Sequence, residues 1–290
     1  MTKIAGYEII PLHVGDFKLD GGAMFGVVPK PLWEKQCPAD ARNRIDMTAR
    51  ALLLKTPQRT IVVDAGIGQK DDDKFREIFD ITFPHGGIVE SLSQHGVSPE
   101  QVTDVIYTHL HFDHAGGTTV MKDGIAVPLF PNARHYVQSA QYHHGRSRNP
   151  RDRASYIDMN YEPVRSAGLL EFLEGDTELF PGLHLDLTSG HTPALQMIRI
   201  SDGKQTMFYP SDLIPMAAHV PLPYIMGYDL FPLTTLNDKE HWLGKAAREG
   251  WLIVLEHDPK IEAMKVQFDE KGRIRIAQTG TLEELNNPDA

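Results

Sequence analysis

The chain has 290 residues, of which 41% are hydrophobic and 23% are charged, and its formal net charge is −10. A chain of this length and composition can bury a core, which excludes disorder as its dominant state. The acidic balance argues against nucleic acid as a partner, because binding to that polyanion depends on clustered cations. A local basic cluster at Arg146, Arg148, Arg151 and Arg153 is interpreted as a solvated loop.

Short runs of apolar and β-branched residues recur along the whole chain, and Gly, Pro, Asp or His ends each run. Runs of this kind predict strands. In chain order, the predicted strands are Ile4–Val14, Ala51–Lys55, Thr60–Val63, Asp104–Tyr107, Arg134–Val137, Leu183–Leu187, Leu195–Ile200, Thr206–Tyr209, Trp251–Leu255, Ala263–Phe268 and Arg273–Ala277.

Helical signals lie between these strands. The apolar spacing across 88–96 predicts a short helix with a glycine stop. A further helix is expected within Asp152–Glu174, where the apolar spacing is less regular. Asn237 and Glu240 form a capping box, which predicts a helix that ends at Gly250.

The chain contains no low-complexity stretch, short-period repeat or flexible linker. We therefore expect residues 1–290 to form a single domain of the α/β class. Two sheets packed on each other, with helices outside, would bury the nearly continuous apolar runs.

Cys37 is the single cysteine, so an intramolecular disulfide and a thiolate zinc cluster are both excluded. The N-terminal residues lack a long apolar region, and no run of about 18 apolar residues occurs. These features predict a soluble, cytoplasmic protein with no membrane partner.

The segment Asp104–Gly117 carries the chemistry, because an apolar strand leads directly into His109, His111, Asp113 and His114. By chance, the pattern His-x-His-x-Asp-His would occur roughly 0.003 times in a chain of this composition. Four ligand-type residues within six positions therefore indicate a metal site. With many histidines and one cysteine, the expected ligands are nitrogen and oxygen atoms.

Three further residues, His191, Asp212 and His257, each follow the end of a predicted strand, as His109 does. Ligands at strand ends can converge on one edge of a rigid sheet. Five histidines and two aspartates are too many for one tetrahedral ion. They suit two ions about 3.5–4 Å apart, bridged by a carboxylate and a hydroxide. The positive charge of the two ions lowers the pKa of bound water to about 7.

These residues resemble the ligand set of the metallo-β-lactamase fold superfamily, and the resemblance spans nearly the whole chain. It implies a four-layer αβ/βα sandwich with a dinuclear site at one edge of the facing sheets. It also implies that His109, His111 and His191 hold the first metal ion, that Asp113, His114 and His257 hold the second, and that Asp212 bridges the two. Asp64 matches an early aspartate of the family and is interpreted as a structural or supporting residue rather than a ligand.

The resemblance also separates the subfamilies. Asp212 stands where the common dizinc β-lactamases have cysteine, which disfavours antibiotic hydrolysis, and His111 stands where flavodiiron proteins have glutamate. The segment Leu19–Trp33 closely resembles the N-terminal segment of the YtnP-like quorum-quenching lactonases and is similar to that of methyl parathion hydrolase relatives. Ala194 departs from this pattern, since many relatives have glycine there.

Two segments, Met24–Trp33 and Met216–Phe231, are expected to overhang the site, because their Pro, Met and aromatic residues suit the lining of an apolar pocket. The substrate-binding candidates are Met24, Phe25, Phe112, His219, Tyr224 and Tyr228. His219 is also a candidate proton shuttle, and the two tyrosines could donate to a developing oxyanion. The alternative is that these segments cover the core or form a homodimer contact.

The leading hypothesis is a hydrolase with two Zn²⁺ per chain, although Mn, Fe or Co suit the same ligands. The resemblance implies N-acyl-homoserine lactones as substrates, with ring opening by a metal-bridging hydroxide. Asp212 would bridge the metals, and Asp113 would relay a proton. The alternative is hydrolysis of phosphotriesters or other esters by the same site. Thioesterase or nuclease activity and a non-enzymatic metal-binding module are weaker alternatives.

Overall fold

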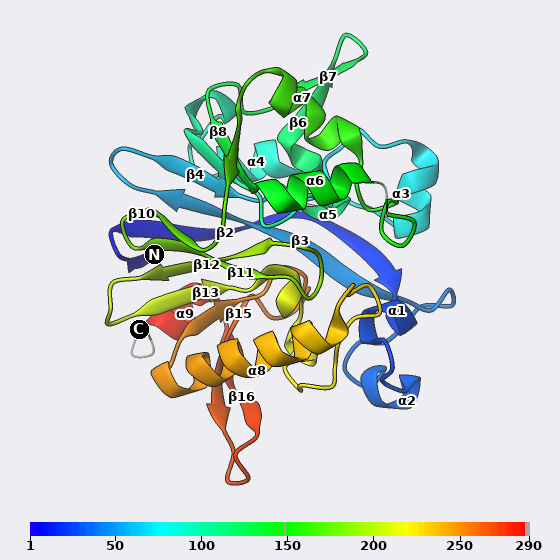
Figure 1. Cartoon of the computed structure of the whole chain (residues 1–290), viewed down its shortest axis with the longest axis vertical. Coiled ribbons are helices and arrows are strands. Elements are labelled where there is room, and N and C mark those ends of the chain that lie inside the picture. The colour runs from blue at the N-terminus through cyan, green and yellow to red at the C-terminus, as the bar shows by residue number, and fades with distance from the viewer. Residues whose placement is uncertain (148, 288–290) are drawn as a thin grey trace. The chain divides into compact units, whose positions relative to one another are not determined.

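The computed structural model describes residues 1–147 and 149–287 (Figure 1), so Arg148 and residues 288–290 lie outside the described residues. The chain divides into two compact units. The first unit comprises Met1–Ala5, Lys18–Met47 and Asp176–Ala290, and the second unit comprises Gly6–Phe17 and Thr48–Gly175. A single domain over residues 1–290 therefore stays a prediction.

The second unit is built on one sheet with the strand order β2-β3-β4-β5-β8-β9. Its strands are β2 (Tyr7–Asp20), β3 (Arg44–Lys55), β4 (Thr60–Val63), β5 (Asp104–Ile106), β8 (Arg134–Gln138) and β9 (Leu170–Leu173), with a separate hairpin of β6 (Thr119–Lys122) and β7 (Ile125–Pro128). Its helices are α3 (Asp73–Phe79), α4 (Ile88–Ser93), α5 (Phe112–Ala115), α6 (Ser139–Ser147) and α7 (Glu162–Ser166), with 3₁₀ turns η1 (Pro99–Gln101), η2 (Gly116–Thr118) and η3 (Asp158–Asn160). The carboxyl end of β2, from residue 18, and the amino end of β3, up to residue 47, belong to the first unit.

Neighbouring strands from β4 to β9 in this sheet run parallel. Parallel strands need crossover connections, and helices of this unit lie in those connections. Behind β5 and β8, the apolar residues Tyr107, Leu110, Val137 and Tyr161 pack into a buried cluster. The carboxyl end of β5 is therefore a fixed point, and the histidine motif begins immediately after it.

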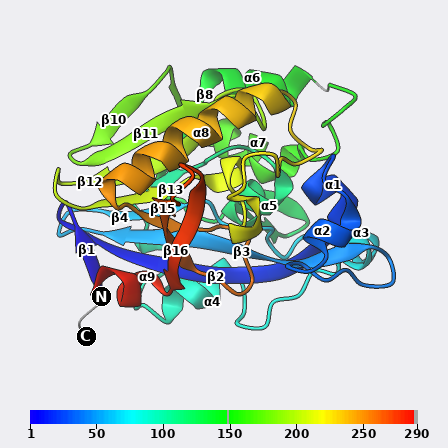
Figure 2. The same ribbon diagram turned by 90° about the horizontal axis from the view of Figure 1, so that it is seen from below.

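The first unit has a sheet with the strand order β10-β11-β12-β13-β14-β15-β16. Its elements are β1 (Thr2–Ile4), β10 (Thr177–Phe180), β11 (Leu183–Thr188), β12 (Leu195–Ser201), β13 (Thr206–Tyr209), β14 (Leu252–Val254), β15 (Ala263–Phe268), β16 (Ile274–Gly280), α1 (Gly21–Phe25), α2 (Lys30–Trp33), α8 (Pro232–Glu249) and α9 (Leu282–Asn286), with 3₁₀ turns η4 (Ser211–Leu213) and η5 (Ala217–His219). Helix α8 lies across this sheet, as both views show (Figures 1 and 2), and its Leu243 and Ala246 pack on Phe208, Ile253 and Met264.

In the first unit, the strand directions place the starts of three loops at the same edge of the sheet. Strands β13 and β14 are parallel, while β12 is antiparallel to both β11 and β13. Strands β11, β13 and β14 therefore run in the same direction. Their carboxyl ends lie on the same edge of the sheet, and His191, Asp212 and His257 follow these ends.

The α/β class is confirmed, and each predicted strand overlaps an observed strand. The weak signals of β6, β7, β9 and β10 were missed, because their residues are largely exposed or half-buried and lack a continuous apolar run. The helix expected within Asp152–Glu174 is only η3 and α7, followed by β9. Of the helices in the described residues, none is long and apolar enough to cross a membrane.

The predicted capping box at Asn237 and Glu240 is wrong. Helix α8 begins earlier, at Pro232, with Phe231 as its N-cap residue. Proline suits the first helical position, because its fixed φ is helical and its missing N–H would have no intrahelical acceptor there. The predicted end is confirmed, since Gly250 adopts a left-handed conformation with φ 69° and caps the helix.

Candidate metal centre

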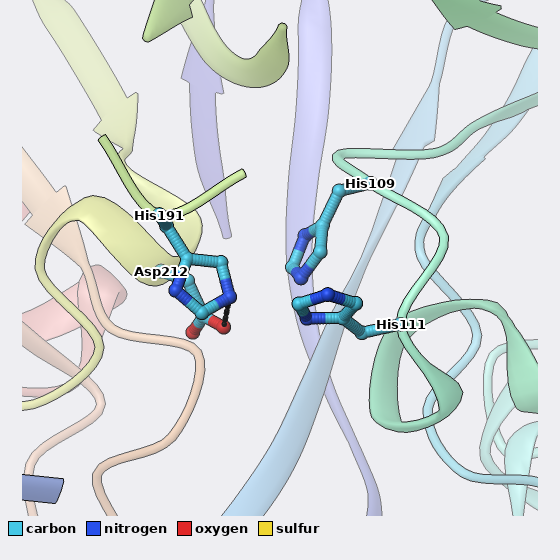
Figure 3. Close-up of side chains that lie close together, drawn as sticks. All are labelled: His109, His111, His191 and Asp212. Carbon is cyan, nitrogen blue, oxygen red and sulfur yellow. Dashed lines mark ion pairs between the residues drawn. The ribbon is translucent and has the colours of Figure 1, made fainter. Parts of the chain in front are cut away.

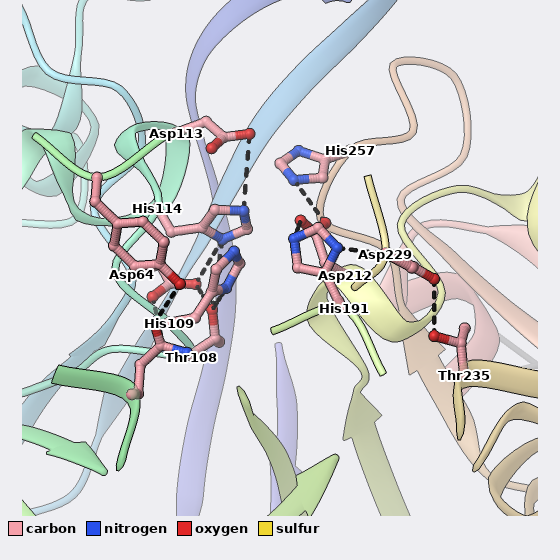
Figure 4. Close-up of polar contacts among 12 residues, drawn as sticks. Asp64, Thr108, His109, Asp113, His114, His191, Asp212, Asp229, Thr235 and His257 are labelled. Atoms are coloured by element: carbon pink, nitrogen blue, oxygen red, sulfur yellow. Dashed lines mark hydrogen bonds and ion pairs between the residues drawn. The ribbon is translucent and has the colours of Figure 1, made fainter. Parts of the chain in front are cut away.

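The ligand-type residues of the second unit lie on the loop that leaves β5 and on the short helix α5. His109, His111, Asp113 and His114 are all buried. The ring centroids of His109 and His114 are 3.9 Å apart, and those of His109 and His111 are 4.5 Å apart (Figures 3 and 4). The Oδ2 atom of Asp113 lies 3.8 Å from Nε2 of His114. The motif thus gathers three imidazoles and a carboxylate within one unit.

Asp64 organises this group from the end of β4. Its Oδ1 accepts a hydrogen bond from the backbone N–H of Thr108 at 2.8 Å, and its Oδ2 accepts one from the Thr108 hydroxyl at 2.6 Å. The same Oδ2 lies 3.2 Å from Nδ1 of His114 (Figure 4). A carboxylate at Nδ1 fixes the ring orientation and directs Nε2 outward for a ligand. Asp64 reaches this position with a φ of 53°, an unusual conformation for a non-glycine residue.

Two glycines let the motif pack closely on the loop that follows Asp64. A Cβ atom on Gly116 would overlap the carbonyl oxygen of Ile67, and one on Gly117 would overlap that of Ala65. The N–H of Gly117 also donates to the carbonyl of Gly66 at 2.9 Å. The Gly-Gly pair after the motif therefore has a packing reason, because any larger residue would push α5 and its histidines off this loop.

In the first unit, Asp212 lies between two histidines. Its Oδ2 is 3.1 Å from Nε2 of His191, and its Oδ1 is 3.1 Å from Nε2 of His257 (Figure 4). Each carboxylate oxygen thus faces a different imidazole. This arrangement is the one expected of a carboxylate whose two oxygens serve two neighbouring cations. Ser211, just before it, has a φ of 49°, so the backbone is strained at this turn.

Sequence reasoning missed Asp229, which holds His191 from the other side. Its Oδ1 lies 2.9 Å from Nδ1 of His191, and its Oδ2 accepts a hydrogen bond from the Thr235 hydroxyl at 2.8 Å. Burial of His191 opposes its protonation, but the carboxylates of Asp212 and Asp229 outweigh burial and raise the pKa of this imidazole to about 10. The surroundings of Nε2 therefore favour positive charge.

The donor set fits a first-row transition metal. Every predicted ligand is a buried imidazole or carboxylate, the ligand types that zinc and its neighbours accept. Asp64 and Asp229 supply the outer hydrogen bonds that metal-ligating histidines usually have. The sole cysteine, Cys37, belongs to a different part of the first unit, where burial raises the pKa of its thiol to about 11.

Most of the substrate-binding candidates in the first unit belong to one aromatic cluster. Phe25 stacks on Trp33 with ring centroids 5.1 Å apart and on His219 at 4.8 Å, and Tyr224 meets its edge at 6.0 Å. Met24 and Phe25 have no exposed surface, whereas Tyr228 is 38% exposed. His219 donates from Nε2 to the Met24 carbonyl at 2.8 Å, and burial lowers its pKa to about 3. These contacts support the core-covering alternative for Phe25, and the substrate roles stay predictions.

Phe112 has different neighbours in the second unit. Its ring centroid is 5.1 Å from that of Phe75 and 4.9 Å from that of Phe79, and both of these belong to α3. Helix α3 has no fully buried residue, so its two phenylalanines are half-exposed. Sequence reasoning missed this pair, although aromatic residues four apart after the N-cap Asp72 share one helix face.

Four residues outside the predicted ligand set and the substrate-binding candidates are placed as follows. His143 is exposed, whereas the side chain of His144 is only 15% exposed and its Nε2 pairs with Oδ2 of Asp152 at 2.6 Å. Arg146 is exposed and pairs with Asp158 at 2.9 Å. Ala194 has a φ of 55°, the left-handed region that favours glycine.

Comparison with protein-family models gives one description for most of the chain. The model for the metallo-beta-lactamase superfamily matches residues 47–257. This range includes every predicted ligand, from His109 to His257.

Individual relatives are similar over different shares of the chain. An N-acyl homoserine lactonase of Bacillus cereus is 28% identical over 173 residues, which cover 56% of this chain and 62% of the relative. The matches thus span less than two thirds of the curated relatives' length. A crystal structure described as a probable metal-dependent hydrolase from Staphylococcus aureus is 31% identical, with a TM-score of 0.87, and the match covers 97% of this chain and 99% of that one. The dizinc quorum-quenching lactonase AidC is 20% identical with a TM-score of 0.77, covering 97% of each chain, which shows a shared fold.

Proposed function

Because the chain belongs to the metallo-beta-lactamase superfamily and has its α/β fold, we propose that it is a dinuclear-metal hydrolase that opens the ring of N-acyl-homoserine lactones. The observation that carries the dinuclear site is Asp212, whose two oxygens each lie 3.1 Å from a different imidazole. The lactonase relatives support the substrate class, and zinc is the proposed metal.

We keep the ligand assignment that the family resemblance implies, and each of the two units would supply part of it. The second unit would supply His109 and His111 to one ion and Asp113 and His114 to the other. The first unit would supply His191, His257 and the proposed bridge Asp212. In each unit the candidate ligands follow the ends of strands and their side chains are buried. Metal binding should therefore require little further ordering of these side chains.

When bound, the metal ions would supply a water of lowered pKa as nucleophile and would polarise the carbonyl of the substrate. Residues of the chain position the proposed ligands and transfer the proton. Asp64 and Asp229 hold the imidazoles of His114 and His191 in one orientation. Asp113, which is 6% exposed, is proposed to relay a proton to the leaving oxygen of the opened ring.

We propose that the acyl tail of the substrate contacts the half-exposed rings of Phe75 and Phe79 beside Phe112. These rings present apolar surface next to the α5 helix that carries Asp113 and His114. A net charge of −10 adds a preference for a neutral lactone over a polyanion.

The test is a comparison of kcat/KM for a long-chain acyl homoserine lactone and a neutral aryl phosphotriester, with zinc-loaded and chelator-treated enzyme. We expect lactone opening to exceed phosphotriester hydrolysis and to vanish on chelation. Rapid phosphotriester hydrolysis without lactone turnover would replace the proposed substrate and keep the metal site. Full lactone turnover after chelation would overturn the metal site itself.

A further inference from the structure

A cavity of about 530 Å³ lies within the first unit, between α8, the loop 220–224 and the β15–β16 hairpin. Its volume falls in the range of roughly 300–1,000 Å³ typical of small-molecule sites. None of the predicted metal ligands lines it. The cavity is therefore a candidate binding site separate from the proposed metal centre.

The floor of the cavity is apolar and held in place. It is formed by Val220, Leu222 and Ile274, with Phe268 at its side. The buried Lys239 of α8 donates from Nζ to the carbonyls of Tyr224 at 2.7 Å, Pro221 at 3.1 Å and Leu222 at 3.4 Å. Because one side chain ties three carbonyls of the loop to the helix, this wall is already shaped before any ligand arrives.

Three arginines line the same cavity, namely Arg248, Arg273 and Arg275. Asp269 holds two of them, with its Oδ2 2.8 Å from Nε of Arg273 and 3.4 Å from Nε of Arg275. Arg248 is exposed and, among the described residues, has no hydrogen-bond or ion-pair partner. In a chain with a net charge of −10, three guanidinium groups beside the two carboxylates of Asp269 and Glu240 leave a local excess of positive charge at the cavity.

A glycine of α8 lines the cavity next to Arg248. Gly244 lies inside α8, one turn before Arg248, although glycine in a helix interior is unfavourable. A Cβ atom built there would meet nothing closer than Nη1 of Arg248, at 3.4 Å, which is ordinary van der Waals contact. No neighbouring backbone therefore requires a glycine at this position. The missing side chain instead lets the guanidinium group of Arg248 lie against this glycine, with Nη1 3.4 Å and Nη2 3.8 Å from the Cβ position.

We propose that this cavity binds a small amphiphilic anion, with its acidic headgroup at Arg248 and Arg275 and its apolar chain over Gly244 on the floor formed by Leu222 and Ile274. Arginine suits such a headgroup, because its planar donors match carboxylate and phosphate oxygens. The site does not depend on the proposed hydrolase function.

Glu240 sets the expected selectivity of the site. It lines the cavity two turns before Arg248 on α8, at a separation of about 12 Å along the helix axis. A ligand with an anion at only one end avoids this carboxylate. A ligand with an anion at both ends brings its second charge towards Glu240, where like charges repel. The cavity should therefore prefer ligands that carry an anionic group at only one end.

The test is calorimetric titration of the purified full chain with decanoate below its micelle concentration, with decyl phosphate, decanol and decanedioate as comparison ligands. We expect decanoate or decyl phosphate to bind saturably, and the tighter of the two identifies the headgroup. Decanol and decanedioate should bind at least tenfold more weakly. Decanol binding as tightly as the anions, or no saturable binding of either anion, would overturn the proposal.

Variants locate the binding within the chain. Arg248→Ala should raise the Kd about tenfold, the size expected for one lost charge-assisted hydrogen bond, and Arg248→Lys should recover part of it. Gly244→Met should abolish binding, whereas Gly244→Ala should retain it.

Arg134→Ala, at an exposed arginine of β8 paired with Glu171, is the matched control and should leave the Kd unchanged. Thermal melting confirms folding. Unchanged Kd values in both Arg248→Ala and Gly244→Met would place the ligand elsewhere and refute the site.

Discussion

The Nδ1 atom of His191 lies 2.9 Å from Oδ1 of Asp229, so this imidazole is held by a carboxylate that is not itself among the predicted ligands. The hydroxyl of Thr235 at the start of α8 holds that carboxylate in turn. A chain of contacts therefore runs from a helix of the first unit to the Nε2 atom that would bind metal.

Replacing Asp229 should weaken metal binding without removing a ligand. We expect Asp229→Ala to lower the affinity for zinc by about 10–100-fold, the usual effect of losing such a support. Competition with a chromophoric chelator measures this affinity. Asp186→Ala is the control, because Asp186 pairs with Arg199 and contacts no predicted ligand. An unchanged zinc affinity in Asp229→Ala would show that His191 needs no support.

The metal stoichiometry should be about two ions per chain, as seven ligand-type residues and a doubly engaged Asp212 imply. Elemental analysis of protein purified without chelator measures it. One ion per chain would remove the bridging assignment of Asp212, and none with full activity would remove the metal site.

Loss of a ligand should abolish turnover, whereas loss of a bystander should not. We expect His111→Ala and Asp212→Ala each to lower kcat/KM by several orders of magnitude, because metal and its activated water are lost together. His143→Ala and Cys37→Ser should retain nearly full activity, since neither residue contacts the ligand group. If Asp212→Ala keeps both its metals and its rate, the proposed bridge is wrong.

Catalytic efficiency should rise with the length of the acyl tail. Each buried methylene is worth about 0.8 kcal/mol, which corresponds to a few-fold in kcat/KM. A series of acyl homoserine lactones measures this slope, and Phe75→Ala should flatten it. Phe172→Ala is the control, because this exposed phenylalanine of β9 contacts Tyr142 and His143 instead. A flat response in the unsubstituted enzyme would remove the apolar contact from the proposal.

Acid should destabilise the second unit through His135, which is not a predicted ligand. Burial lowers its pKa to about 4, and Nδ1 lies 3.1 Å from the Tyr107 hydroxyl. Since the unfolded histidine has a pKa near 6.5, the unfolded state binds more protons between pH 6.5 and 4. The stability from neutral His135 is therefore present above pH 6.5 and is lost as the pH falls towards 4, by about 3 kcal/mol in all.

Urea unfolding of the metal-free chain between pH 4 and 7 measures this effect. The free energy of unfolding of His135→Gln should fall less steeply with acid than that of the unsubstituted chain, because the other histidines, the proposed metal ligands included, are common to both and cancel. Parallel pH profiles for the two proteins would show that His135 does not carry the effect.

The amino-acid sequence alone predicted the strands that precede the candidate ligands, and it singled out the candidate ligands themselves. The reason is local, because a continuous apolar run ends where its strand ends, and the ligand-type residues follow within a few positions. Four of these residues lie within one six-residue motif, and the others follow strands such as β13 and β14.

Only the tertiary structure identified the partners of these ligands. Asp229 is 38 residues from His191 in the chain, and Asp64 is 50 residues from His114, so no local pattern links them. The start of α8 at Pro232 likewise depended on packing and on the proline ring rather than on the capping box. Residues far apart in sequence become neighbours only through strand order and direction, and those are set by burial across the whole sheet rather than by any short stretch of residues.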